Sequence, residues 1–175
     1  MPEVARAFKK FLQDGSVNVL ECWVSADPHD LPKGPDFPKK ILAAIDEAHI
    51  CVALLNHESL KNWWVNFETG VFYGHEKPVH GLLCCGLSHT HIQAKGHPLG
   101  SNGTNFIYPN EADLLSFFIS VLDEARKKTG SQLLTDDQLK LNVGASFKNF
   151  IAIYNNYCGN LPSIDMDELL SNIED

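Results

Sequence analysis

The fold is decided by residues 50–87, which have the sequence ICVALLNHESLKNWWVNFETGVFYGHEKPVHGLLCCGL. Residues 50–55 and 79–87 are nearly continuous apolar runs, and such runs are typical of buried parallel strands. Between them, Ser59 is a suitable N-cap for a helix that continues to about Tyr73, and the following Gly74 is typical of a helix end. The segment therefore predicts a strand, a helix and a second strand.

The alternation continues on both sides of this segment. Apolar side chains at helical spacing predict a helix over residues 37–48, and a second, strongly amphipathic helix is expected over residues 111–128. A short strand is expected at residues 105–108. Strands that alternate with helices in this way predict an α/β fold, with helices on both faces of a parallel sheet in a three-layer arrangement.

A helix, a strand and a long loop are expected at the N-terminal end. Residues 4–12 carry apolar side chains at helical spacing, and Gly15 is a suitable end for that helix. Residues 17–24 are rich in β-branched and aromatic side chains and predict a strand. Residues 25–36 are dense in Pro, Gly and Asp and predict a loop.

The C-terminal part is expected to be a helical extension, residues 129–175, that follows a domain formed by residues 1–128. Residues 129–132 have the composition of a linker. Asp165 and Glu168 have the spacing of a capping box before a final acidic amphipathic turn, and the alternative is a solvated, frayed chain end. The apolar positions of the extension are Leu139, Val143, Phe147, Phe150, Ile151 and Tyr154.

Composition excludes several classes of protein. The chain has 175 residues, about one domain, and a formal net charge of -8, which argues against a surface that tracks nucleic-acid phosphates. Its apolar runs fall short of the roughly 18 to 20 residues that span a bilayer, and the first residues lack the pattern of a signal peptide. We therefore expect a cytoplasmic protein that contacts neither nucleic acid nor membrane.

The five cysteines are irregularly spaced, which argues against a disulfide scaffold. Cys84 and Cys85 precede His89 and His91, but this spacing matches no recognised zinc motif. Both thiols fall in an apolar run, where we expect reduced, inert side chains; a Cys-His nucleophilic pair is the alternative. Because the glycine-rich phosphate-binding motifs are also absent, we expect neither a metal nor a bound cofactor.

Glu68 is the most informative single residue. On the predicted helix its neighbours one turn away in both directions are apolar: Trp64, Val65, Val71 and Phe72. A carboxylate on an apolar stripe must be solvated through a cleft, paired, or shifted towards its neutral form. The alternative is a surface glutamate that extends its side chain into water.

Several further residues occur in an ordered set around Glu68. They are Trp23, Val24 and Ser25 at the end of the predicted strand, Asp27, Asp30, Lys33, Gly34 and Phe37 in and after the loop, and the motifs Trp64-x-x-x-Glu68 and Phe67-Glu68-x-Gly70. With this set, residues 4–125 resemble a Toll/interleukin-1 receptor (TIR) domain of the bacterial type. TIR domains begin with a central strand, whereas this chain opens with a helix, so the first strand is expected to be absent.

The resemblance implies a flavodoxin-like sheet and, in enzymatic members, cleavage of the bond between nicotinamide and ribose in NAD. The catalytic glutamate of the family matches Glu68. The substrate-binding residues that the resemblance implies are Ser25, Asp27, Lys33, Gly34, Phe37 and Trp64. For Phe37 and Trp64 the alternative is a role in packing, because each also fits an apolar helix face.

The sequence therefore leads to one main functional hypothesis and two alternatives. The main hypothesis is a TIR-domain NAD nucleosidase that forms nicotinamide and ADP-ribose, or a cyclic isomer, in bacterial antiphage immune signalling. It would use NAD as substrate, need no cofactor, and self-associate with other TIR domains. The alternatives are a TIR adaptor without catalytic activity and a nucleoside deoxyribosyltransferase-like enzyme.

Overall fold

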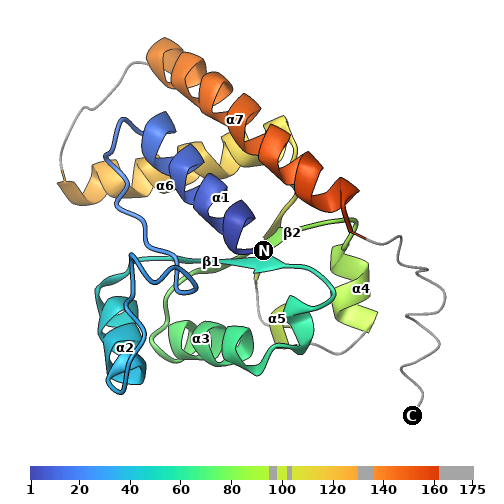
Figure 1. The fold of residues 1–175 in the computed structure, drawn as a ribbon. Coiled ribbons are helices and arrows are strands. Elements are labelled where there is room, and N and C mark those ends of the chain that lie inside the picture. The colour runs from blue at the N-terminus through green and yellow to red at the C-terminus, as the bar shows by residue number, and fades with distance from the viewer. Residues whose placement is uncertain (95–97, 102–103, 130–135, 162–175) are drawn as a thin grey trace.

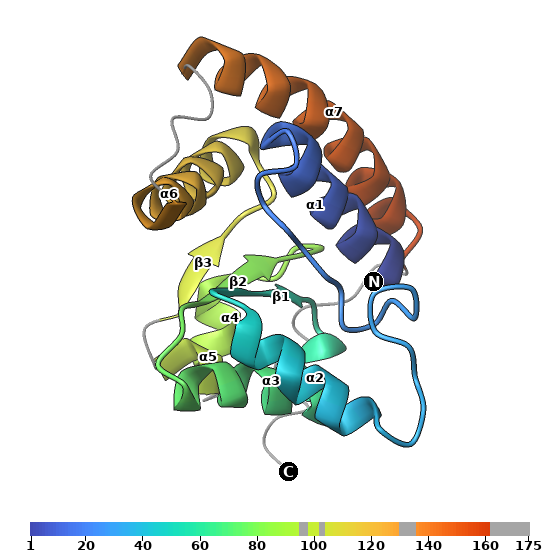
Figure 2. The same cartoon turned by 90° about the vertical axis from the view of Figure 1, so that its left-hand side faces the viewer.

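The structure, a computed structural model, describes residues 1–94, 98–101, 104–129 and 136–161. Its sheet has three parallel strands in the order β1-β2-β3, formed by Cys51–Leu55, Val79–Leu83 and Asn105–Ile107 (Figure 1 and Figure 2). Cys51 pairs with Val79, and His80 pairs with Asn105. The prediction of an α/β fold with a parallel sheet is thereby confirmed.

Helices cover both faces of the sheet. On one face lie α1 (Pro2–Gly15), α6 (Glu111–Thr129) and α7 (Asp136–Gly159), and on the other lie α2 (Phe37–Glu47), α3 (Trp63–Gly74), α4 (His89–Ala94) and α5 (Pro98–Ser101) (Figure 2). The helices expected over residues 37–48 and 111–128, and the strand expected near residue 105, are confirmed to within a few residues. None of the helices in the described ranges is long and apolar enough to cross a membrane.

The alternation of side chains along β2 explains why the sheet has two buried faces. Val79 and Leu83 pack into the cluster beneath α2 and α3, whereas Leu82 packs into the cluster with α1, α6 and α7. A Cβ on Gly81 would come within 2.9 Å of side chains from both neighbouring strands. Glycine at this position therefore lets side chains of β1 and β3 pack over β2.

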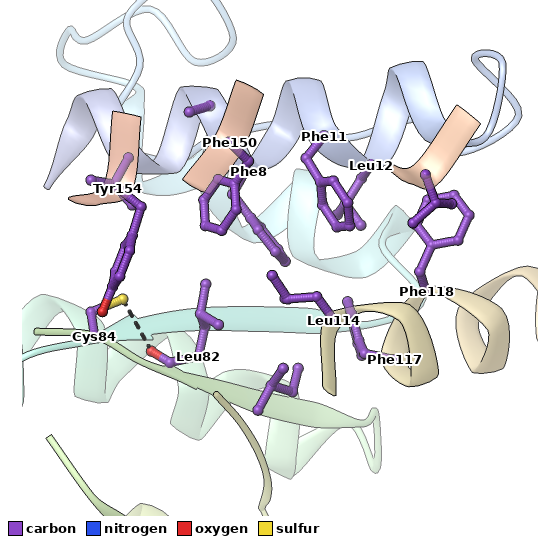
Figure 3. Close-up of a cluster of buried hydrophobic side chains, with 14 of the residues drawn as sticks. Phe8, Phe11, Leu12, Leu82, Cys84, Leu114, Phe117, Phe118, Phe150 and Tyr154 are labelled. Atoms are coloured by element: carbon purple, nitrogen blue, oxygen red, sulfur yellow. Dashed lines mark hydrogen bonds between the residues drawn. The ribbon is translucent and has the colours of Figure 1, made fainter. Parts of the chain in front are cut away.

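An aromatic cluster joins α7 to α1 and α6 (Figure 3). The ring of Phe150 on α7 lies 5.5 Å from Phe8 and 5.8 Å from Phe11, both on α1. Phe118 of α6 contacts Phe11 from the other side, at 5.7 Å between ring centroids. Because these rings are buried, α7 shares one hydrophobic core with the helices that precede it.

The strand predicted over residues 17–24 is wrong. Val17 and Asn18 have left-handed backbone conformations, with φ of 53° and 60°, which form a tight turn directly after α1. Further along, the backbone N–H of Val24 donates to the Asp30 carboxylate at 2.7 Å. The segment is a turn followed by irregular chain and is not part of the sheet. A strand requires a backbone partner as well as suitable side chains, and the turn and side-chain contacts direct this backbone elsewhere.

The predicted start of the central helix is also wrong. Ser59 begins a single 3-10 turn, Ser59–Lys61, and exchanges hydrogen bonds with Asn56. The N-cap of α3 is Asn62, whose side-chain oxygen accepts from the N–H of Trp64 at 2.9 Å. Both residue types are good caps, and the choice between them depends on how the loop leaves β1.

The second strand ends earlier than predicted, and one expected thiol is oxidised. β2 stops at Leu83, and Cys85 has a left-handed backbone conformation with φ of 53°, which a strand cannot accommodate. Cys85 forms a disulfide with Cys158 of α7, so the expectation of a reduced, inert thiol is wrong for Cys85. The capping box predicted at Asp165 and Glu168 lies outside the described residues.

Candidate active site

Glu68 lies in the middle of α3, where its carboxylate meets the loop that follows residue 24. The hydroxyl of Ser25 donates to Glu68 Oε2 at 3.1 Å. The other oxygen, Oε1, is buried and has no hydrogen-bond partner among the described residues. No ion pair in the described ranges involves Glu68. The carboxylate is therefore half-satisfied, without a cation that would neutralise it.

The electrostatic consequence is a carboxyl group that titrates near neutrality. Burial raises the pKa of Glu68 to about 7 from an ordinary value of 4.5, and the hydrogen bond from Ser25 and the nearby Trp64 side chain oppose that rise. The buried thiol of Cys51 on β1 lies close enough for the Glu68 charge to help raise its pKa, which reaches about 12 chiefly through burial. A group that titrates near 7 can exist in either protonation state under ordinary conditions.

Aromatic rings gather around Trp64, whose side chain interacts with the Glu68 carboxylate. Phe37 stacks on Trp64 with ring centroids 5.6 Å apart, and Phe67 lies 5.4 Å from the same Trp64 ring. Trp63 contacts Trp64 edge to face at 5.0 Å and is itself 69% exposed, whereas Phe67 is 38% exposed. The result is a partly exposed aromatic surface centred on Trp64, one turn before Glu68.

The structure brings together only some of the residues that the sequence suggested for this site. Ser25 donates to Glu68 and Phe37 stacks on Trp64. The two pairs meet where the Trp64 side chain lies close enough to Glu68 to oppose the rise of its pKa. Asp27, by contrast, is buried and engaged within its own loop, where it accepts from the His29 N–H at 3.0 Å.

Asp27 also contacts α1, because Arg6 lies 3.5 Å from its carboxylate. The pKa of Asp27 is lowered, first by the backbone hydrogen bond from His29 and further by Arg6. These contacts describe a residue that ties the loop to α1 rather than one that faces Glu68. Lys33 and Gly34 lie in the exposed part of the loop and make no described contact with the Glu68 carboxylate.

Two exposed aromatic residues of this surface, Trp63 and Phe67, were not among the predicted site residues. The sequence signal was present, because positions 63, 64 and 67 are aromatic and α3 brings such positions onto neighbouring faces. The proximity of Cys51 to Glu68 had no such signal, since it depends on how α3 packs against β1.

In the described part of the chain, the cysteines and histidines of residues 84–91 are not grouped as metal ligands. Cys85 is bonded to Cys158, and His91 Nδ1 accepts from the backbone N–H of Ser88 at 3.1 Å. No group of three or more potential metal ligands occurs among the residues that the structure describes. His97 lies outside these residues.

A cavity of about 230 Å³ lies elsewhere, between α6 and α7. It is lined by Leu115, Ile119, Leu122, Asp123, Leu139, Lys140 and Val143. None of the residues around Glu68 contributes to it, so the candidate site rests on the carboxylate and its aromatic surroundings instead.

Searches of protein-family models, curated proteins and solved structures returned no significant match to the chain.

Proposed function

We propose that the chain is a TIR-type NAD nucleosidase in which Glu68 is the catalytic carboxylate. The observation that supports this most directly is a half-buried carboxylate that has one hydrogen bond from Ser25, no ion pair among the described residues and a partly exposed aromatic surface beside it. On this proposal the parallel sheet is part of a flavodoxin-like TIR sheet. The role would be the one the resemblance implies, cytoplasmic antiphage immune signalling by self-associated TIR domains.

The chemistry needs only one carboxylate. Breaking the bond between ribose C1′ and the nicotinamide nitrogen generates an oxocarbenium-like charge on the ribose, and the electron pair of the broken bond neutralises the nicotinamide ring. The leaving group therefore needs no general acid. An ionised Glu68 beside the ribose would stabilise the developing charge, and Ser25 would hold the carboxylate in position. Water then adds to C1′ and loses a proton, giving ADP-ribose.

The raised pKa makes this proposal sensitive to pH. Only the ionised carboxylate stabilises a positive charge, so kcat/KM should rise as the pH increases through about 7 in the free enzyme. Binding of the cationic nicotinamide ring would favour ionisation, and the rise in kcat should therefore occur at lower pH than the rise in kcat/KM.

The direct test is nicotinamide release from NAD at high protein concentration, measured by chromatography. Glu68→Ala and Glu68→Gln should abolish release while leaving the circular dichroism spectrum unchanged. Glu21→Gln is the matched control, because Glu21 is exposed and lies outside α3, and it should leave the rate unchanged. Release that continues undiminished in both Glu68 variants would refute the assignment.

A TIR-type adaptor is the second candidate, and the exposure of Trp63 and Phe67 favours it. Large exposed aromatic side chains that lie side by side are typical of protein-binding surfaces. An adaptor would show concentration-dependent self-association that Trp63→Ala weakens, together with no heat of NAD binding in calorimetry. The enzyme hypothesis predicts turnover that Glu68→Ala removes.

A further inference from the structure

We propose that Cys85 and Cys158 form a redox-active disulfide site, which closes and opens by exchange with small-molecule thiols and disulfides of the glutathione class. The proposal is independent of the function suggested for Glu68. It rests on where the fold places these two residues, 73 positions apart in the sequence.

Contacts other than the bond itself also hold the two cysteines near each other. Their Cα atoms are 5.3 Å apart, which lies within the range that disulfides require. The ring of Phe150 anchors α7 against α1 two turns before Cys158. One turn before Cys158, the hydroxyl of Tyr154 accepts from the backbone N–H of Cys85 at 2.8 Å. These contacts would hold the thiols in register after reduction, so the bond can re-form.

Both cysteines of the pair are more exposed to solvent than Cys84, which is next to Cys85 in the chain. Cys85 and Cys158 are both half-buried, since Cys85 lies in the turn after β2 and Cys158 in the last turn of α7. Cys84 is fully buried and its thiol lies 3.5 Å from the carbonyl oxygen of Leu82. An exchange reagent can therefore reach the pair, while Cys84 is shielded from it.

The reaction balances as two successive exchanges. A thiolate of the reduced pair attacks one sulfur of glutathione disulfide, which forms a mixed disulfide and releases one glutathione thiolate. The second protein thiolate then attacks the protein sulfur of that mixed disulfide, forms the Cys85–Cys158 bond and releases the second glutathione. The two protein thiols lose two protons and two electrons, and one glutathione disulfide becomes two glutathione thiols.

The consequence is a covalent connection between the end of β2 and the end of α7 that depends on the redox state. In the oxidised chain, the last turn of α7 is bonded to the turn that follows β2. In the reduced chain, noncovalent contacts alone hold it there. They include the hydrogen bond from Cys85 to Tyr154, the hydrogen bond from the amino group of Met1 to the Tyr157 hydroxyl at 3.1 Å, and the packing of α7 on the aromatic cluster. The oxidised form should therefore melt at a temperature higher by at least about 4 °C.

The test is a titration of the full chain in buffers of varied glutathione to glutathione disulfide ratio. After an acid quench, denaturation and alkylation, intact mass should show five modified cysteines in the reduced form and three in the oxidised form, because the chain has five cysteines. The conversion should be a single two-electron transition. It should be lost in Cys85→Ser and Cys158→Ser and retained in Cys22→Ser, a half-buried cysteine outside the pair.

Peptide mapping and thermal melting complete the test. The oxidised form should yield one linked peptide pair that contains Cys85 and Cys158, and the melting difference between the two redox forms should vanish in either serine variant. Stable glutathione adducts as the end point, a different cysteine pairing, or equal melting temperatures for the two forms would each overturn the proposal. If a serine variant unfolds, the corresponding alanine variant provides the same comparison.

Discussion

Replacing Glu68 by glutamine should stabilise the folded chain at pH 8, although it removes the proposed catalytic group. The pKa of Glu68 is about 7 in the folded chain against an ordinary value of 4.5, so the folded state holds the proton more tightly than the unfolded state does. Stability is therefore lost as the pH rises from about 4.5 to about 7. The two pKa values differ by about 2.5. Because one pKa unit corresponds to about 1.4 kcal/mol, this difference lowers the free energy of unfolding by roughly 3 kcal/mol.

The Glu68→Gln variant would keep the geometry and remove the charge. The amide oxygen of the new side chain can still accept from the Ser25 hydroxyl, which now bonds the Glu68 carboxylate at 3.1 Å. The variant should therefore gain up to about 3 kcal/mol over the natural chain at pH 8 and less than about 1 kcal/mol at pH 5, where the native carboxyl is protonated. Glu21→Gln, which changes an exposed carboxylate, serves as the control for the loss of one negative charge.

The measurement is urea unfolding at pH 5 and pH 8, followed by circular dichroism. Tryptophan fluorescence is less suitable, because Trp64 lies within one helical turn of the substitution. The slope of free energy against urea should not change, so the effect should appear in the midpoint alone. A difference between the two chains that is the same at both pH values would refute the reasoning, as would an equal pH-dependent gain in Glu21→Gln.

Three further predictions concern stability, each measured as the free energy of unfolding in urea. Phe150→Ala should lose about 3 to 5 kcal/mol because the ring is buried between two helices, whereas Ile153→Ala on the exposed side of the same helix should lose less than about 1 kcal/mol. Gly81→Ala should lose about 1 to 3 kcal/mol, because its Cβ would come within 2.9 Å of side chains on both neighbouring strands. Gly144→Ala is the control: its Cβ would meet open space on a helix, so the variant should gain about 0.5 to 1 kcal/mol. Asn62→Ala should lose about 1 kcal/mol and Asn62→Asp should not, because only alanine removes the side-chain acceptor at the start of α3; an equal loss in both would contradict the capping role.

The strand-helix-strand segment was predictable from the sequence because local pattern and tertiary packing agree there. β1 and β2 are buried on both faces, so their apolar runs carry no competing signal, and the helix between them shows its end at Gly74. The unusual position of Glu68 was also visible, since its helical neighbours are apolar whatever the helix packs against. These conclusions depend only on residues close together in the chain.

The main contacts that the sequence did not determine join residues far apart in the chain. Residues 17–24 have strand-forming side chains, but whether they join a sheet depends on a backbone partner, and the sheet contains none for them among the described residues. The approach of Ser25 to Glu68 spans 43 positions, and that of Cys85 to Cys158 spans 73. Local pattern contains no information on such distances, because they are set by how α3 and α7 pack on the two faces of the sheet. The sequence therefore determined the order of most elements and the chemistry of one carboxylate, and tertiary packing decided which groups surround it and which thiols meet.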